Sequence, residues 1–209
     1  RHLAVLRLRP GSALELVLPS GVWRADLAEL GRDRAVVRLV APLEEDREPP
    51  FPIHVHLPVT AQLSSLEEIL APIVELGATV IQPVAYARSE ADFRKLATRM
   101  DRWRRILVAA CEQSHRGRIP ELRPAAPFAA LLECPLEQKW FAYEVRSGSA
   151  NPGWNPAPLA LTSGPEGGIT DGEAAALVEA GWLPVSLGGS ILRAVTAPVA
   201  LLGAARFQM

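Results

Sequence analysis

Cysteine is almost absent from this sequence of 209 residues, which contains only Cys111 and Cys134. A disulfide framework or a zinc site needs more than two distant cysteines, so neither is expected. The chain has no uninterrupted apolar run of about 18 residues, which argues against a membrane-spanning helix. Its first residues lack the basic region and apolar run of a signal peptide. These absences predict a protein of a reducing, cytoplasmic compartment.

Lysine is also scarce, and the positive charge therefore has an unusual composition. Lys95 and Lys139 are the two lysines, whereas the other 20 of the 22 basic residues are arginines. The formal net charge is −1, so the whole chain lacks the excess positive charge typical of nucleic-acid-binding proteins. The planar guanidinium group of arginine suits contacts with phosphates and bases. A GC-rich genome, which favours arginine codons, explains the bias equally well.

Residues 1–48 have the pattern of a small, separate β domain. Short segments with strand-like alternation at 3–9, 14–18, 22–27 and 34–40 are separated by turn residues. Short strands at close spacing predict an antiparallel barrel or meander. Fewer than about 50 residues bury too little surface to be stable alone. We therefore expect this unit to pack on the rest of the chain or to use residues that precede position 1.

After an acidic and proline-rich linker at 44–52, strands alternate with helices. Strands are predicted at 53–59, 79–84, 140–145, 159–163 and 183–187, and helices at 65–76, 89–110, 171–180 and 193–205. This alternation predicts an α/β domain with a parallel sheet over residues 49–209. Pro72 is expected to kink or break its helix. Ser89 is expected to cap the next helix, with Asp92 three residues on.

Two glycine-rich loops lie where ligands bind open α/β sheets, beyond the carboxyl ends of strands. The sequence has neither the G-x-G-x-x-G of a dinucleotide site nor the pattern of a P-loop. Glycines nevertheless let the backbone approach a flat ligand closely, although each loop alone is more often a simple turn. The candidate cofactor-binding residues are Thr162, Ser163, Gly164, Glu166, Gly167, Gly168, Leu187, Gly188, Ile191 and Leu192.

Several motifs in one order give these loops a more specific meaning. Gly-Pro-Glu-Gly-Gly-Ile at 164–169 is followed by Leu-Gly at 187–188 and Ile-Leu-Arg-Ala at 191–194. Further motifs occupy 2–11, 75–83, 88–89, 102–116 and 119–121. In this order the chain resembles the ribosomal RNA small-subunit methyltransferase E family over nearly its whole length.

The resemblance implies a fold, an activity and partners that the residue patterns alone do not. It implies a SPOUT-type α/β methyltransferase domain with a deep C-terminal trefoil knot, preceded by a small PUA-like β-barrel domain. It implies that S-adenosylmethionine is the cofactor, and that a homodimer methylates N3 of one uridine in 16S rRNA. Free 16S rRNA or the small ribosomal subunit would be the partner, with no metal and no membrane.

Two departures from the family pattern leave other functions open. The segment at 58–63 lacks the usual lysine, and Val195 stands where the family has a glutamate. A non-catalytic SPOUT-fold RNA-binding protein, or a methyltransferase for another RNA, therefore remains an alternative. Arg193 is the predicted catalytic residue, since a cation there would offset charge on the base. The other interpretation of Arg193 is a salt bridge at the dimer interface.

The candidate RNA-binding residues are arginines of both predicted domains: Arg7, Arg9, Arg24, Arg88, Arg102, Arg116 and Arg118. Three of them, Arg102, Arg116 and Arg118, belong to a basic stretch at 94–118, although a charged helix face is usually only solvated. Trp154 lies in a predicted loop and is expected to stack on a base or to cover the knot. His54 and His56 have the i, i+2 spacing of metal ligands but no third ligand nearby, so ordinary packing is expected.

Overall fold

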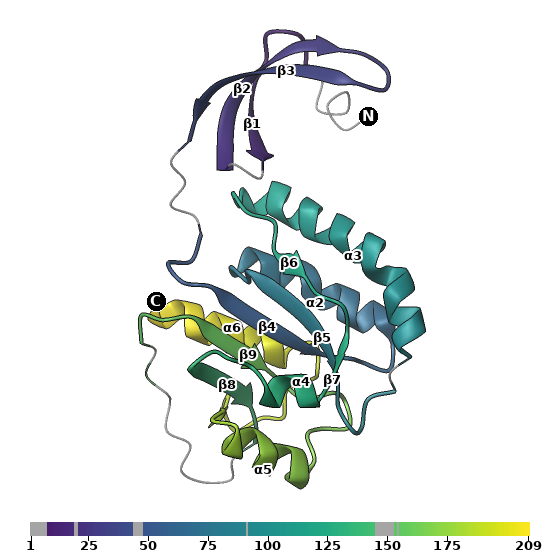
Figure 1. Cartoon of the computed structure of the whole chain (residues 1–209), viewed down its shortest axis with the longest axis vertical. Helices are drawn as coiled ribbons and strands as arrows, with labels where there is room; N and C mark the ends of the chain where they lie inside the picture. The colour runs from purple at the N-terminus through teal and green to yellow at the C-terminus, as the bar shows by residue number, and fades with distance from the viewer. Residues whose placement is uncertain (1–7, 19–20, 44–47, 91, 145–152, 154) are drawn as a thin grey trace. The chain divides into compact units, whose positions relative to one another are not determined.

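The computed structural model describes residues 8–18, 21–43, 48–90, 92–144, 153 and 155–209. Contacts within the chain divide it into two compact units, Arg1–Glu48 and Pro49–Met209 (Figure 1). Within the described part of the chain, none of the helices is long and apolar enough to cross a membrane. Arg7 and Trp154, two predicted RNA contacts, lie outside the described residues.

The first unit contains a three-stranded antiparallel sheet in the order β1–β2–β3. Its strands are β1 (Ala13–Leu18), β2 (Gly21–Leu30) and β3 (Ala35–Pro42). In β2 the buried residues are Val22, Ala25 and Leu27, because a register shift between Arg24 and Ala25 interrupts strict alternation. Such a bulge turns the following side chains to the opposite face. The described strands form the expected meander, while the PUA-like barrel stays a prediction.

The second unit is built on a parallel sheet, which confirms the predicted α/β class. Its strand order is β10–β8–β9–β4–β5–β6, with β7 also paired to β5, and all of these pairs are parallel. The strands are β4 (Ile53–Pro58), β5 (Val80–Ala85), β6 (Glu121–Leu122), β7 (Ala126–Pro127), β8 (Gln138–Ala142), β9 (Leu159–Thr162) and β10 (Leu183–Val185).

Helices cover both faces of this sheet, as parallel strands require. The helices are α2 (Leu63–Glu75), α3 (Phe93–Ser114), α4 (Ala129–Leu132), α5 (Asp171–Glu179) and α6 (Ala197–Gln208) (Figure 1). Buried residues of α2, α3 and α6 share one core with Ile53, Val55 and Leu57 of β4. Buried residues of α4 and α5 share a second core with Phe141 and Trp182.

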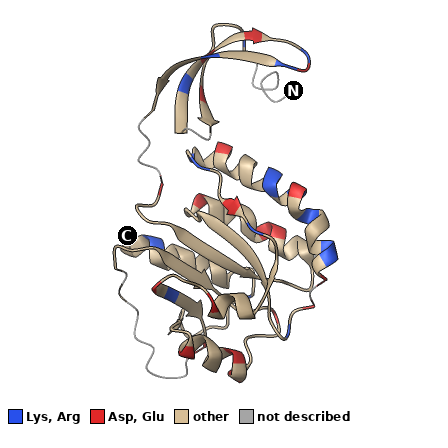
Figure 2. Ribbon diagram, in the orientation of Figure 1, with Lys and Arg blue, Asp and Glu red and all other residues tan. Residues whose placement is uncertain are grey.

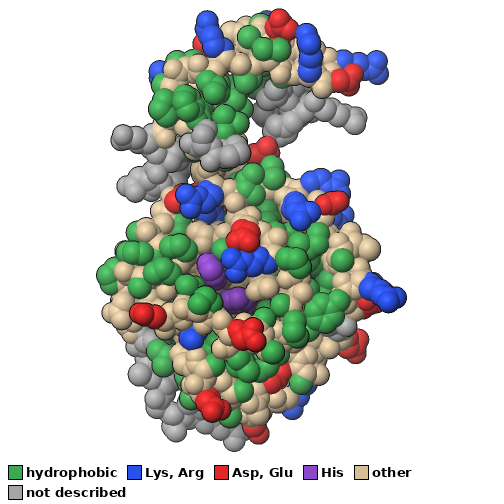
Figure 3. All heavy atoms as spheres, viewed as in Figure 1, with side chains coloured by type: hydrophobic (Ala, Val, Ile, Leu, Met, Phe, Trp, Pro, Cys, Tyr) green, Lys and Arg blue, Asp and Glu red, His purple; other side chains and the backbone are tan. Residues whose placement is uncertain are grey.

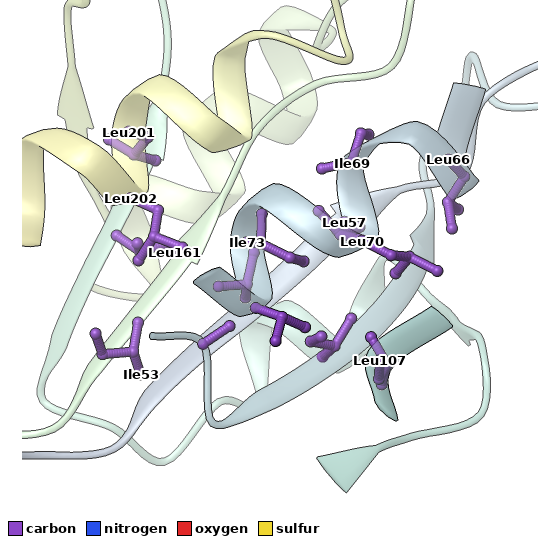
Figure 4. Close-up of a cluster of buried hydrophobic side chains, with 14 of the residues drawn as sticks. Ile53, Leu57, Leu66, Ile69, Leu70, Ile73, Leu107, Leu161, Leu201 and Leu202 are labelled. Carbon is purple, nitrogen blue, oxygen red and sulfur yellow. The ribbon is translucent and has the colours of Figure 1, made fainter. Parts of the chain in front are cut away.

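The first core explains the continuous apolar character of the central strands. Figure 4 shows Leu201 and Leu202 of α6 beside Leu161 of β9, with Ile73 of α2 nearby. Trp103, Trp140 and Trp182 are at most 1% exposed, which confirms their expected core positions. Cys111 and Cys134 are buried free thiols.

Three local predictions were wrong in whole or in part. Helix α2 is not broken at Pro72, because Ile69, Leu70, Ile73 and Val74 around the proline are buried and hold both halves of the helix in the core, while the expected kink stays a prediction. Asp92, not Ser89, caps α3, since its side chain accepts the backbone N–H groups of Arg94 and Lys95. Helix α6 begins at Ala197, later than expected, after a turn in which Arg193 O accepts the N–H groups of Thr196 and Ala197.

Candidate functional site

A cavity of about 770 Å³ opens beyond the carboxyl ends of β8, β9 and β10. Three segments form most of its wall, at 142–144, 164–169 and 185–197, and α2 contributes Ser65 and Glu68. The volume lies within the roughly 300–1,000 Å³ of small-molecule sites. Strand ends that are adjacent in the sheet thus bring together segments that are distant in sequence.

The cavity joins the two glycine-rich loops that the sequence singled out. Eight of the predicted site residues lie on its wall: Gly164, Glu166, Gly168, Leu187, Gly188, Ile191, Leu192 and Arg193. Thr162, Ser163 and Gly167 do not line it. The wall also includes residues that the sequence analysis missed, among them Ser65, Glu68, Tyr143 and Glu144. The last two directly follow β8, so their position after a strand was an available signal.

Thr162 holds neighbouring strands together beneath the loop. Its hydroxyl donates to the carbonyl oxygen of His56 at 3.0 Å, so the Tyr86 hydroxyl, 2.7 Å away, donates to Thr162 Oγ1. Burial raises the pKa of Tyr86, although the hydrogen bond with Thr162 opposes that shift. Ser163 is fully buried as well. Both side chains therefore lie in the interior, and the cavity wall begins at Gly164.

Glycine is required at Gly164 because the loop folds tightly back on itself. A Cβ atom there would lie 2.8 Å from Ile169 Cγ1 and 3.1 Å from Ile169 N. Gly168 has φ +75° and Gly188 has φ +113°, in the left-handed region that side chains disfavour. The two loops can therefore place their backbones directly on the cavity wall.

Replacing Gly164 by alanine is expected to weaken ligand binding in the cavity about fivefold to 150-fold, because the added Cβ displaces the Ile169 backbone and overpacking costs about 1–3 kcal/mol. Isothermal titration calorimetry measures the affinity. Gly172→Ala is the matched control, since nothing lies within 4 Å of its Cβ position in α5. Equal affinities of the two variants would show that the Gly164 turn does not shape the site.

The buried carboxylate of Glu173 links the start of α5 to the segment between β5 and α3. Its Oε1 accepts the N–H of Ala87 at 2.7 Å, and its Oε2 accepts the N–H of Thr170 at 2.9 Å. Thr170 and Glu173 form a capping box at the start of α5. The Thr-x-x-Glu pattern was a signal for this cap, but not for the contact with Ala87.

The cavity wall is acidic. Glu68, Glu144 and Glu166 face it with Arg193 as the one basic side chain among the described wall residues. Glu166 Oε2 also accepts the N–H of Ala61 at 3.4 Å, which links the 164–168 loop to the segment after β4. This balance favours a ligand that carries positive charge, since opposite charges attract more strongly where water is partly excluded.

Arg116, predicted to contact RNA, is instead a structural residue. Its side chain is buried, and Nη1 donates to the carbonyl oxygens of Val74 and Ala78 at 2.9 and 2.7 Å. It thereby satisfies carbonyl groups at and after the end of α2, as basic side chains do at helix C-termini. Its burial corrects the prediction, because a phosphate cannot reach the guanidinium group.

Arg102 is exposed but ion-paired, with Nε 2.9 Å from Glu67 Oε2. Trp103 Nε1 donates to the other oxygen of Glu67, so this carboxylate joins α2 to α3. Figure 2 marks basic and acidic residues along the ribbon of α3. Arg9, Arg24 and Arg118 are exposed, as RNA contacts require. Arg88 is exposed too, but its guanidinium group binds a loop carbonyl within the chain.

The two histidines of β4 lie on the sheet face with the second core. His56 is 4% exposed and contacts Trp182 edge-on, with ring centroids 5.9 Å apart. Figure 3 shows histidine side chains on this face beside basic and acidic groups. Among the residues that the structure describes, no group of three or more His, Cys, Asp or Glu side chains could hold a metal ion. Packing of His56 agrees with the sequence-based expectation.

Burial, then repulsion from His54 and Arg123, lowers the pKa of His56 to about 4. The His56 imidazole binds a proton near pH 6.5 in the unfolded chain but only near pH 4 in the folded one. Acidification below pH 6.5 therefore stabilises the unfolded state relative to the folded state. The free energy of unfolding is expected to fall by up to about 3 kcal/mol between pH 6.5 and 4. Urea denaturation of the protein and of His56→Leu measures this difference. Parallel pH curves for the two would exclude His56 as the cause.

Comparison with known proteins identifies the family. Residues 47–206 match the model of the RNA methyltransferase domain. The ribosomal RNA small subunit methyltransferase E of Synechocystis is 35% identical over 208 residues, which cover 95% of this chain and 67% of that protein. The Bacillus subtilis protein of the same name is 28% identical, over 98% of this chain and 85% of that protein.

Solved structures agree with these sequence matches. The Neisseria gonorrhoeae ribosomal RNA small subunit methyltransferase E bound to S-adenosyl methionine is 34% identical with a TM-score of 0.89, covering 99% of this chain and 87% of that one. A putative methyltransferase of Legionella pneumophila, in complex with SAM, is 30% identical with a TM-score of 0.87, covering 98% and 86%. The chain therefore belongs to the ribosomal RNA small subunit methyltransferase E family.

Proposed function

We propose that this chain is an S-adenosylmethionine-dependent rRNA methyltransferase that modifies N3 of one uridine in 16S rRNA. The observation that carries the proposal is the single cavity in which the 164–169 loop meets the 187–195 loop. Membership of the family supports the same activity. The uridine N3 position rests on the resemblance to the family.

The residues of the cavity fit S-adenosylmethionine. Leu187, Ile191 and Leu192 offer apolar surface for the faces of an adenine ring, while glycine backbones offer N–H and C=O groups to its edge. The wall carboxylates Glu68 and Glu144 complement the positive sulfonium and ammonium groups. When bound, this cofactor supplies the methyl group that is transferred.

Arg193 is the residue proposed to act on the base. It lies on the cavity wall, exposed, in the turn that precedes α6. Uridine N3 must lose its proton to become a nucleophile, and the uracil ring then carries negative charge. A guanidinium group beside the ring stabilises this charge without itself changing protonation. Glu68, Glu144 and Glu166 are the carboxylates near enough to the same cavity to accept the proton.

The proposed RNA contacts are exposed arginines, Arg9 and Arg24 in the first unit and Arg118 in the second. Contacts of this kind release counterions, so binding should weaken steeply with salt. The homodimer, the trefoil knot and the PUA-like barrel stay predictions from the family resemblance. So does 16S rRNA, free or in the small subunit, as the partner.

One feature favours the second candidate, a non-catalytic RNA-binding protein of the same fold. Val195 occupies the position of the family's usual glutamate, and its side chain lines the cavity and packs on the main core. A carboxylate is therefore absent at this place. The wall still holds Glu68, Glu144 and Glu166, so the loss at Val195 does not leave the cavity without carboxylates.

Calorimetric titration with S-adenosylmethionine is the first test, and saturable binding of one cofactor per chain is expected. No binding at millimolar cofactor would exclude the enzyme. The second test is mass spectrometry of 16S rRNA from a strain that lacks the gene. The loss of one N3-methyluridine, restored by the purified protein, is expected. An unchanged methylation pattern would leave the RNA-binding protein or another RNA substrate.

A further inference from the structure

The β5–α3 connection contacts three neighbouring segments, one of which is the 164–168 loop of the cavity wall. Ala87 N–H donates to Glu173 Oε1 at 2.7 Å, and Ser89 Oγ donates to Val59 O at 2.9 Å. Arg88 Nη1 donates to Gly167 O, also at 2.7 Å. Three consecutive residues thus bind α5, the segment after β4 and the 164–168 loop. None of the three lines the cavity.

Arg88 contacts the 164–168 loop with its whole side chain. A Cβ atom on Gly167 would lie 2.9 Å from Arg88 Cβ and 3.2 Å from its Cδ, so the stem of the arginine lies directly against the Gly167 backbone. Nη1 would be 3.8 Å from a Cβ on Gly168, whose φ is +75°. The guanidinium group therefore holds the peptide that connects these two glycines.

Arg88 contacts the 164–168 loop at a residue that does not line the cavity. Between Gly164 and Ile169, Gly167 is the residue that does not line the cavity, whereas Glu166 and Gly168 on either side do. Arg88 can therefore hold the loop in place without occupying the space of a ligand. Glycine-rich loops are conformationally free in the absence of such a contact, and a ligand then bears the cost of ordering them.

We propose that Arg88 is a positioning residue that fixes the 164–168 loop for cofactor binding, and not an RNA contact. The inference rests on the proposed function of the cavity. RNA binding by Arg88 would require its guanidinium group to give up the carbonyl of Gly167. The RNA prediction for this arginine is therefore replaced by a role in cofactor affinity.

Two substitutions separate the parts of this contact. Arg88→Met keeps an unbranched apolar stem against Gly167 and removes the donor, while Arg88→Lys keeps a charge and a donor. The methionine variant is expected to bind S-adenosylmethionine about fivefold to tenfold more weakly, the change that loss of one hydrogen bond produces. The lysine variant should recover much of this loss. Affinity for 16S rRNA, measured without cofactor, and its salt dependence should stay unchanged.

Amide hydrogen exchange of the cofactor-free protein gives a second readout, independent of ligand. In Arg88→Met the amides of 166–168 should exchange faster, whereas those of the central strand β4 should not. Arg94→Met, which replaces an exposed arginine in the first turn of α3, is the matched control and should alter neither exchange in the loop nor cofactor affinity.

Unchanged cofactor affinity and unchanged loop exchange in Arg88→Met would overturn the proposal. So would a loss of RNA affinity with a salt slope reduced by about one, which marks a lost phosphate contact. If the wild-type protein binds no S-adenosylmethionine, the proposed function fails. Hydrogen exchange then still decides whether Arg88 orders the loop.

Discussion

Replacing Arg193 by alanine is expected to lower kcat for rRNA methylation about 100-fold to 1,000-fold, the usual effect of removing one group that stabilises transition-state charge. The reason is the charge of the cavity, in which Arg193 is the one basic side chain among three carboxylates of the described wall. Without it, the negative charge that forms on uracil would face an acidic surface. The measurement is single-turnover methyl transfer to 16S rRNA at saturating cofactor.

Affinity for S-adenosylmethionine should change little in Arg193→Ala, since removing this cation does not weaken attraction for the cationic cofactor. Arg193→Lys is the matched variant, and it should retain more of kcat because it keeps the charge without the planar guanidinium group. A normal kcat with a raised KM for RNA would contradict the proposed role. It would instead make Arg193 a residue that binds the substrate equally in its ground and transition states.

Replacing Arg116 by alanine is expected to lower the free energy of unfolding by about 3 to 5 kcal/mol, the range for breaking buried, charge-assisted contacts. Arg116 is 3% exposed, and its guanidinium group binds the carbonyl oxygens of Val74 and Ala78. Its removal takes a charged donor from both carbonyl oxygens, of which Val74 O keeps the N–H of Gly77, and leaves a cavity between the end of α2 and the region after α3. Urea denaturation followed by circular dichroism measures the change.

Arg94→Ala serves as the control for this loss of stability, because Arg94 is an exposed residue of α3. Exposed substitutions of this kind usually change stability by less than about 0.5 kcal/mol. If Arg116→Ala were as stable as this control but bound RNA less tightly, the buried position of Arg116 would be wrong, and the original prediction of an RNA contact would be right.

Helices and strands of the α/β unit were predictable because local rules decide them. Apolar runs at 53–59 and 159–163 coincide with β4 and β9, and helical spacing around Leu66 and Ile73 coincides with α2. The errors fall where local signals compete. Ser89 and Asp92 are two possible helix caps three residues apart. Only the side chain of Asp92 accepts hydrogen bonds from the first backbone N–H groups of α3. Ser89 has other partners.

The two loops of the site were also predictable, since glycines after apolar strands mark places where the backbone turns sharply or meets a ligand. Gly164 and Gly188 were recognised in this way, and both lie on the cavity wall. Glu68 could not be recognised. It lies in the middle of α2, where a charged residue normally indicates only a solvated face.

By itself, the sequence determined the class of fold, the places of most elements and the two loops that meet in the cavity, because periodicity and turn residues act over a few neighbouring positions. Only the tertiary structure decided what individual charged side chains do. Arg88, Arg102 and Arg116 look alike as basic residues, yet one binds a loop carbonyl, one a partly buried carboxylate and one buried helix-end carbonyls. Their partners lie 35 to 79 residues away in the chain, a separation over which no local pattern operates.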